Sequence, residues 1–489
     1  HKHWQTYVLN LSNNPIRQIF ARNSFISSKL STKLSLKIPL ALAPLLLLPY
    51  SLESQALSAT TSERIHGTAP YLTFDGGVTK VTKTEDLLGI KLSDGRTFTP
   101  QNNPSSPTAP IKLPNVGDTL ADIEMIVPPS SDSININDLV TQGKWRDDDG
   151  DGQGAGEVTA SGSISLAITD KDDNTINRSD ALDICKAPYK VTLSSTEGNL
   201  ATQYGEPRSS TFSGGTAEYY ITPSSQPVIC SVRPNLFIGT GSYAGPANIW
   251  SPTKGFLVQS TNPSSYNRNF PTTGSDGLYF DLDIGGIDGG QLSWTVNTRG
   301  SLGATVSRVG SNTRVTLNGP RASSSQISSS NPGQITVPTL PQTFELVGRD
   351  SSGNEVRYGF VLRQWFVSRG QTWSIYSDQL AWCNSLGYRL AKVRDLTNAK
   401  CGVNSNFPCI NGINGATPSS SVNYYMRYIG AGFFTEWGDM NDYTDAGFVH
   451  GSYWTSDATG SNQSTVGSNS GYVYSFSASD SNYAVCTAP

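Results

Sequence analysis

The sequence predicts a mainly β protein, with tandem β-sandwiches followed by a C-terminal module that mixes helix and strand. Only 15% of the 489 residues are charged, whereas Gly (47) and Pro (28) are plentiful, which favours short strands joined by turns over long helices. Runs of alternating apolar residues recur through the middle of the chain. The last 119 residues hold 19 of the 47 aromatic residues and the clearest helical pattern.

The first 56 residues predict an export signal. Basic residues up to Lys37 precede the apolar run 38–48, and small residues follow at 54–56. A positive region, a short apolar core and a small-residue cleavage site are the parts of a secretory signal. Because a helix needs ~20 apolar residues to span the hydrocarbon of a bilayer, this run is too short to be a membrane anchor. No later segment is apolar enough to cross a membrane.

The charge balance argues against nucleic acid as a partner. Residues 1–56 hold six of the 35 basic residues and one of the 39 acidic residues, which leaves 29 bases and 38 acids in 57–489, a net charge of -9. A chain this acidic, with no cluster of Lys and Arg, is repelled by a phosphate backbone.

Six cysteines fit the exported assignment. Their even number predicts disulfides, with one bridge in the earlier part of the chain, Cys185–Cys230, and two bridges among the four cysteines of the last quarter. No C-x-x-C spacing occurs, so we expect neither a zinc site nor a redox motif.

Alternating apolar runs predict two sandwiches. We assign residues 57–114 to an N-terminal extension and linker, 115–250 to a first sandwich and 251–367 to a second. Strands of the first sandwich are expected at 123–127, 162–169, 189–193 and 217–222, with Cys185–Cys230 tying two of its strands. Those of the second are expected at 255–259, 277–283, 292–296, 304–308 and 313–317, followed by the hairpin 344–362 with its turn at 351–354. Seven short strands in about 110 residues are typical of an immunoglobulin-like sandwich.

The last segment, 368–489, changes character. Its helix is expected to start at a Ser377 cap, to place Leu380, Cys383 and Leu386 on one face, and to end at Gly387. A strand at 388–391, a short helical stretch at 393–398 and strands at 451–456, 471–476 and 483–486 are expected after it.

Short motifs in this segment resemble a C-type-lectin-like domain. The motifs are Trp382-Cys383-Asn384, Gly387-Tyr388-Arg389-Leu390, Tyr453-Trp454-Thr455-Ser456 and Ala484-Val485-Cys486. Such a domain after immunoglobulin-like sandwiches resembles the passenger of enterobacterial invasin and intimin-like adhesins, and residues 115–250 resemble their adhesion domain. The resemblance implies a bridge from the first helix to the last strand, Cys383–Cys486, and we expect Cys401–Cys409 beside it.

The resemblance implies an exported adhesin and virulence factor, not an enzyme. It would bind a host or bacterial surface protein or glycan through 368–489, and would be secreted or displayed on a Gram-negative cell, with periplasmic retention as the alternative. Invasin-type adhesins carry their own outer-membrane β-barrel, for which the 60 or so residues after the signal are too few. A separate barrel protein is therefore expected as translocator. Two other hypotheses are a carbohydrate-binding lectin and a relative of formylglycine-generating oxidases.

The candidate ligand-binding residues lie between 423 and 445. Aromatic side chains in loops of small residues provide large contact areas for proteins and sugars. By resemblance to invasin, an exposed aspartate there could engage an integrin-bound ion. The candidates are Tyr424, Tyr425, Arg427, Tyr428, Trp437, Asp439, Asp442 and Asp445, whereas Phe433, Phe434 and Trp454 are expected in the core.

Calcium is the one ion for which the sequence offers a candidate loop. Asp147, Asp149 and Asp151, followed by Gly152, match the first half of a calcium loop, but Val158 stands where a bidentate Glu belongs, so a solvated acidic turn fits equally well. No catalytic residue is predicted, because the only histidines beyond the signal, His66 and His450, sit in no catalytic motif. No cofactor is expected to be required.

Overall fold

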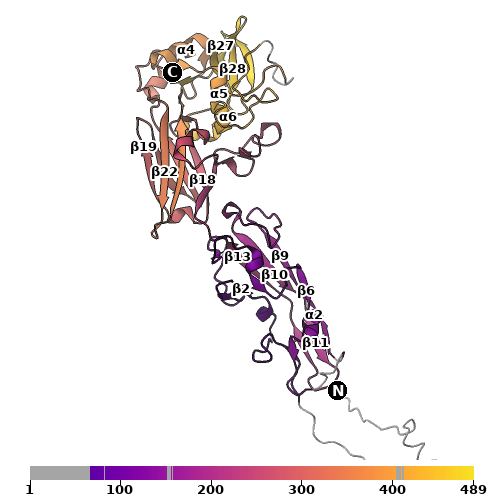
Figure 1. The fold of residues 1–489 in the computed structure, drawn as a ribbon. Helices are drawn as coiled ribbons and strands as arrows, with labels where there is room; N and C mark the ends of the chain where they lie inside the picture. The colour runs from indigo at the N-terminus through magenta and orange to yellow at the C-terminus, as the bar shows by residue number, and fades with distance from the viewer. Residues whose placement is uncertain are drawn as a thin grey trace, which may run out of the picture. The chain divides into compact units, whose positions relative to one another are not determined.

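The computed structural model describes residues 67–488, apart from 82, 151–155, 157, 404–408, 410 and 411. This part of the chain is mainly β, as predicted, and forms two sandwiches and a C-terminal α+β module (Figure 1). The predicted signal, 1–56, lies outside the described residues. Within the described ranges, no helix has both the length and the apolarity that crossing a bilayer demands.

The first sandwich is built on two sheets in which all but one of the strand pairs are antiparallel. The larger sheet has the order β4 (Ile111–Lys112), β13 (Gly215–Thr222), β10 (Tyr189–Ser195), β9 (Ser163–Thr169) and β6 (Ser133–Asn135), with β4 parallel to β13. The smaller has the order β12 (Ser209–Phe212), β11 (Gly198–Thr202) and β8 (Val158–Ser161). Around them lie β1 (Tyr71–Leu72) paired with β7 (Trp145–Arg146), the sheet β3 (Thr97–Phe98), β2 (Ile90–Lys91) and β5 (Glu124–Met125), and α2 (Ile136–Thr141).

Alternation along the strands builds the core of this sandwich. In β10, Tyr189, Val191 and Leu193 are buried while the residues between them are half-exposed, because successive side chains of a strand point to opposite faces. Leu72 and Ile90 belong to the same hydrophobic cluster. The described part of 57–114 is therefore part of the sandwich, and its assignment as an extension and linker was wrong.

The second sandwich has the seven expected strands and a few more. One sheet has the order β15 (Trp250–Ser251), β16 (Gly255–Leu257), β14 (Val228–Arg233), β18 (Tyr279–Gly285), β21 (Asn312–Asn318) and β20 (Gly303–Val309). The other has the order β19 (Ser293–Thr298), β22 (Gln342–Arg349) and β23 (Glu355–Leu362), in which β22 and β23 form the predicted hairpin.

The boundary between the sandwiches differs from the prediction. Strand β14 pairs with β16 and β18 of the second sandwich, so the first ends after Thr222 and not at residue 250. Cys230 lies on β14, so the Cys185–Cys230 bridge joins the two sandwiches and does not tie two strands of one. Residues of β14 pair with residues 24 to 57 positions further along the chain, and local sequence pattern does not reveal such pairing.

The C-terminal module combines small sheets with short helices. Its sheets are β17 (Thr273–Ser275), β24 (Gln364–Ser368), β31 (Val485–Thr487) and β26 (Arg389–Leu390), then β27 (Ser452–Thr459), β28 (Asn462–Gly467) and β29 (Val473–Ser477), then β25 (Ser374–Ile375) and β30 (Ser481–Asn482). Its helices are α4 (Tyr376–Ser385), α5 (Val393–Leu396) and α6 (Phe433–Trp437). Elsewhere lie α3 (Ser324–Ser328) and the 3-10 helices η4 (Thr84–Leu87), η5 (Leu120–Asp122), η6 (Ile184–Lys186), η7 (Gly241–Tyr243), η8 (Pro263–Arg268), η9 (Gly289–Gln291), η10 (Met440–Asp442) and η11 (Thr444–Ala446).

Helix α4 follows the prediction except at its start. It begins at Tyr376 without a side-chain cap, so Ser377 is not the cap; it ends before Gly387, which adopts φ +83°. Cys383 on this helix is joined to Cys486 on β31, and Cys401 is joined to Cys409, the two bridges expected in this module.

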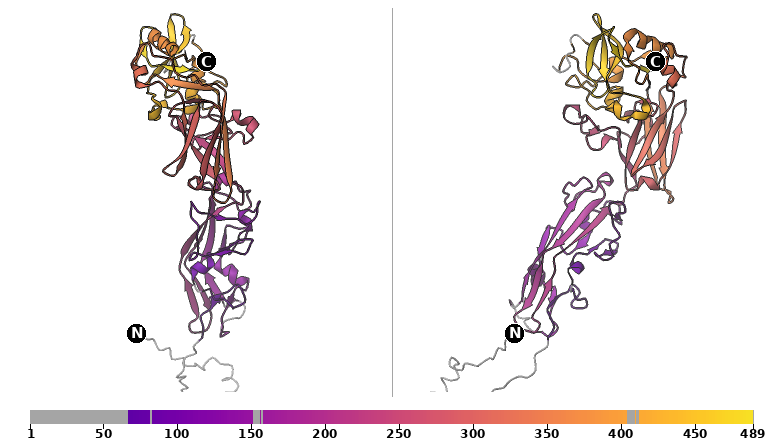
Figure 2. Two further views of the ribbon diagram at one scale, coloured as in Figure 1. Left: turned by 90° about the vertical axis from the view of Figure 1, so that its left-hand side faces the viewer. Right: turned by 180° about the vertical axis from the view of Figure 1, so that it is seen from behind.

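The second sandwich and the C-terminal module share one hydrophobic core. Strand β17 comes from the chain of the sandwich, yet it pairs in parallel with β24, which in turn pairs with β31 of the module. A single cluster of buried side chains runs from Ile229 to Ala488, whereas the first sandwich has its own cluster. Both views of Figure 2 show the module packed directly against the sandwich. These two parts form one folding unit.

An isolated fragment of residues 226–489 is expected to unfold in one cooperative thermal transition. The fragment 368–489 lacks β17 and most of β24 and loses nearly half of the buried side chains of the shared core, so we expect no cooperative transition from it even with both disulfides formed. Circular dichroism during heating checks both fragments. A sharp transition of 368–489 within a few degrees of the longer fragment would contradict the shared core.

Candidate ligand-binding surface

The predicted binding loop alternates between buried and half-exposed side chains. Asn423, Tyr425 and Arg427 are fully buried, while Tyr424 and Tyr428 are half-exposed. Such alternation follows from an extended backbone, in which neighbouring side chains point to opposite sides. Tyr425 and Arg427 were therefore wrongly predicted to contact a ligand.

Arg427 instead fixes a loop of the second sandwich. Its guanidinium donates hydrogen bonds to the backbone carbonyls of Asn235, Phe237 (3.3 Å) and Ile238 (3.3 Å), and to that of Glu436 (3.0 Å) in its own module. The same group lies 4.6 Å from the ring centre of Trp250. Four carbonyl acceptors and an aromatic face compensate for burying this charge.

Glu436, on helix α6 of the module, binds backbone and hydroxyl groups of the segment Thr272–Thr273. Its buried carboxylate accepts hydrogen bonds from the backbone and hydroxyl groups of Thr272 and Thr273, at 2.5 to 3.1 Å, and from the backbone of Gly430 at 2.8 Å. Burial raises the pKa of Glu436, and these hydrogen bonds work against that rise by stabilising the charged form. The carboxylate thereby ties helix α6 to strand β17.

Two further candidate residues, Trp437 and Asp439, are buried. The indole N–H of Trp437 donates to the Thr273 carbonyl (3.1 Å), and its ring packs 4.9 Å from that of Phe270. Asp439 is only 8% exposed and accepts a bond from the Asn441 backbone (3.1 Å). Both were wrongly predicted as ligand contacts, because Trp437, at the end of α6, and Asp439, which caps η10, are buried.

The local sequence explains this geometry. Gly438 adopts φ +83°, and a Cβ at that position would lie 2.1 Å from the Arg427 guanidinium, so only glycine leaves room for it. Phe433, Phe434 and Trp454 are fully buried, as predicted.

Among the predicted residues, Asp442 lines a cleft between the sandwich and the module. It is exposed, and its carboxylate accepts a hydrogen bond from the Asn235 side chain across the boundary. The cleft has a volume of about 630 Å³, and its walls are formed by Arg233, Pro234, Asn235, Leu236, Tyr279, Asp281, Arg314, Asn441, Asp442 and Thr444. Tyr428 and Asp445 are accessible but do not line this cleft.

The sequence offered no signal for Phe237, the most exposed aromatic beside the cleft. Its side chain is 66% exposed, while its carbonyl and that of the next residue are held by Arg427. Ile238 adopts φ +54°, a conformation that is unfavourable for a β-branched residue and occurs where the surroundings enforce it, often at functional sites. The loop is thus fixed with its phenyl ring in solvent.

Tyr243 and Tyr424 extend this aromatic area across the boundary. Their ring centres lie 5.2 Å apart, and the Tyr243 carbonyl accepts a hydrogen bond from the Arg427 backbone (2.8 Å). We call Phe237, Tyr243, Tyr424 and the cleft beside Asp442 the junction surface.

Known proteins are similar to parts of this chain. No family model matches the chain. The inverse autotransporter adhesin YeeJ of Escherichia coli (strain K12) is 27% identical over 137 residues, which cover 27% of this chain and 5% of that protein. The chain is similar to invasin- and intimin-like adhesin passengers.

Two solved structures illustrate the similarity. Invasin, a bacterial integrin-binding protein, is 14% identical with a TM-score of 0.34 and covers 68% of this chain and 50% of its own. A C-terminal fragment of intimin, solved with the intimin-binding domain of the translocated intimin receptor, is 12% identical with a TM-score of 0.30 and covers 68% and 93%. The predicted mainly β fold class, with sandwiches followed by a C-terminal α+β module, agrees with the observed strand order.

The acidic loop predicted for calcium lies at the edge of the first sandwich. Asp147 accepts a bond from the Thr68 hydroxyl (3.1 Å), Asp149 accepts one from the Thr68 backbone (2.7 Å), and Asp148 pairs with Lys80. Asp151 lies outside the described residues. Within the ranges that the structure describes, no three acidic, His or Cys side chains form a metal-binding group, and calcium stays a prediction.

Substitution of Glu436 with Gln is expected to lower the free energy of unfolding of the second sandwich and the C-terminal module, which share one core, by about 2–4 kcal/mol. The amide nitrogen of Gln would face donors of Thr272 or Thr273 and leave them without an acceptor. Denaturant unfolding measures the change. Glu197→Gln, at an exposed position of the first sandwich, is the control, and equal stability of the two variants would contradict the role of Glu436.

Proposed function

We propose that this chain is the ligand-binding part of an exported bacterial adhesin that recognises a protein on another cell. The similarity to an inverse autotransporter adhesin, to an integrin-binding invasin and to intimin solved with a receptor domain supports this proposal. Since the chain spans 5% of the first relative and half of the invasin chain, the activity of those whole proteins is not carried over with it. Three disulfides fit an extracellular location.

The observation that carries the proposal is the fixed loop that holds Phe237 in solvent. An exposed aromatic side chain on a backbone that is already ordered loses little entropy on binding, and such residues dominate the energy of protein interfaces. We therefore place the ligand at the junction surface, which both the immunoglobulin-like sandwich and the lectin-like module build, and not on the module alone.

A sugar-binding function is the second candidate, and Trp373 favours it. Its indole is 65% exposed in the loop before β25 of the lectin-like module, and an exposed ring face suits stacking against a sugar. The oxidase hypothesis has less support, because it requires reactive thiols and all six cysteines are in disulfides. We propose a binding protein and not an enzyme.

Beads coated with the full chain are expected to attach to cultured epithelial cells or to bacterial cells, and Phe237→Ala should weaken attachment at least tenfold. The loss follows from removing a central aromatic contact. Tyr204→Ala, which removes a 58% exposed aromatic of the first sandwich, is the matched control and should bind normally. Normal attachment of the Phe237 variant, together with loss in Trp373→Ala and competition by free glycans, would favour the lectin instead.

A further inference from the structure

Three neighbouring strands bring two cations and one acid into a row beside the cleft. Arg233 on β14 lies opposite Asp281 on β18, which lies opposite Arg314 on β21. Directly opposed residues of a sheet project from the same face at close distance. Two guanidinium groups therefore flank a single carboxylate.

Arg314 and its neighbour take both oxygens of that carboxylate. The Arg314 guanidinium donates to Asp281 at 2.8 and 3.1 Å and stacks 3.7 Å from the ring centre of Tyr279, and Asn312 donates to Asp281 at 3.0 Å. The hydrogen bonds that Arg314 makes with Asp281 raise the pKa of the Arg314 guanidinium. The carboxylate is saturated on this side.

Arg233 is left without an acceptor. Its buried Nε has no hydrogen-bond partner, and no acidic side chain of the described residues pairs with it within 4.0 Å. Because Nε is shielded, the two terminal nitrogens of the half-buried guanidinium are the donors that an outside acceptor can reach, and they match the two oxygens of a carboxylate. Arg233 lines the junction cleft, four residues before Phe237.

We infer that Arg233 binds a carboxylate of the ligand protein while Phe237 enters an apolar pocket of the same protein. This inference rests on the proposed function and names its chemistry: an Asp or Glu side chain next to an apolar depression. A protein side chain is favoured over an acidic sugar, because the phenyl ring four residues away needs an apolar partner surface.

The bead assay tests this inference with Arg233→Met. Attachment should fall at least tenfold and lose much of its salt dependence, while unfolding by denaturant should show no loss of stability, because an unpaired cation has been removed. Arg349→Met is the control, since Arg349 is exposed at the end of β22 and lines neither the cleft beside Asp442 nor the neighbouring cavity of about 530 Å³, both of which Arg233 lines. Proteinase treatment of the cells should abolish the attachment that depends on Arg233.

The outcomes separate the two proposals. If the native chain attaches to no cell, the proposed function fails. If it attaches and Arg233→Met attaches equally well, or if sialidase and not proteinase removes the dependence on Arg233, the carboxylate inference is wrong and the proposed function stands.

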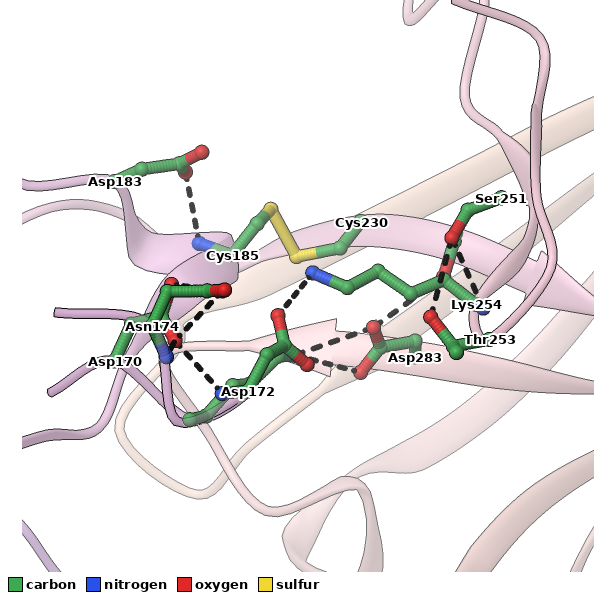
Figure 3. Close-up of polar contacts among 12 residues, drawn as sticks. Asp170, Asp172, Asn174, Asp183, Cys185, Cys230, Ser251, Thr253, Lys254 and Asp283 are labelled. Atoms are coloured by element: carbon green, nitrogen blue, oxygen red, sulfur yellow. Dashed lines mark hydrogen bonds and ion pairs between the residues drawn. A yellow bond between two sulfur atoms is a disulfide. The ribbon is translucent and has the colours of Figure 1, made fainter. Parts of the chain in front are cut away.

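A second inference comes from the joint between the two sandwiches. Cys185 in η6 is bonded to Cys230 on β14, with Cα atoms 5.5 Å apart. Two ion pairs span the same joint, Lys171 with Asp283 at 3.2 Å and Lys254 with Asp172 at 2.6 Å. Figure 3 shows the disulfide next to Asp172, Lys254 and Asp283.

The disulfide encloses four strands of the first sandwich in a covalent loop. Residues 186–229 contain β10, β11, β12 and β13, which include the centre of the larger sheet. A pulling force applied to the two ends of the chain passes from Cys185 directly to Cys230, because the disulfide is the shorter covalent path. The 45-residue separation is then never stretched.

We propose that Cys185–Cys230 is a mechanical bypass that lets an adhesin transmit tension without stretching the segment that contains β10–β13. Under the proposed function, tension enters at the junction surface and leaves towards the N-terminal side. Strand β14 then carries it, since Cys230, Arg233 and the start of the Phe237 loop follow one another along this strand and its end.

Single-molecule pulling of the full chain from its ends tests the bypass. Unfolding of the first sandwich should release about 150 Å less contour length in the oxidised protein than in the variant Cys185→Ser/Cys230→Ser, since an extended residue spans at most ~3.6 Å. Cys401→Ala/Cys409→Ala, which opens a separation of only 8 residues, is the control and should differ by less than ~30 Å. Equal lengths with and without Cys185–Cys230 would contradict the bypass.

Attachment under flow tests whether the bypass serves adhesion. The Cys185→Ser/Cys230→Ser variant should bind cells as the native chain does at rest and detach at lower shear. Equal resistance to shear would show that the bypass has no adhesive role, while the static result would leave the proposed function in place.

Discussion

The buried carboxylate of Glu436 is the contact on which the C-terminal half of the structure depends. It fixes α6 to β17, a strand that comes from the sandwich and pairs with the sheet of the lectin-like module. Arg427, on the same side of the joint, reaches back into the sandwich and holds the loop that carries Phe237. One anion and one cation, each satisfied by backbone groups of the other part, make two predicted domains into one body.

This construction explains why the exposed aromatic area is at the boundary and not within a loop of the module. Most of the large side chains of the segment 423–440 are buried, and several of them bind the second sandwich to the C-terminal module. The accessible aromatic side chains come from both parts: Phe237 from the sandwich and Tyr424 from the module. Strand β14 links this area to the first sandwich, because it carries Cys230 at one end and Arg233 at the other.

Much of the fold followed from local pattern in the sequence. Strands such as β10, β13 and β21 have alternating side chains of which one set is buried, and the hairpin of β22 and β23 has its turn residues in place. The disulfide partners followed from the count of cysteines and the family resemblance. Two assignments failed because pairing is non-local: β14 joins the second sandwich, and β17 joins the lectin-like module.

The exposure of single side chains was harder to predict, because it also depends on contacts between distant parts of the chain. Arg427 and Trp437 stand in a polar, glycine-rich segment that suggests exposure, and only the tertiary structure turns them inward. Phe237 has no local signal, since its exposure depends on the hydrogen bonds of a residue 190 positions away. Asp442 and Tyr424 remain accessible in the structure, and their role in binding stays a prediction.

We expect the second sandwich and the C-terminal module to open together. Native-state hydrogen exchange on the full chain measures this at the amides of Thr273 and Gly430, which both donate to Glu436 from opposite sides of the joint. Both amides should exchange with the same free energy of opening, equal to that of unfolding the whole unit. Exchange of Gly430 through a smaller opening, while Thr273 and the core of the sandwich stay protected, would contradict this expectation.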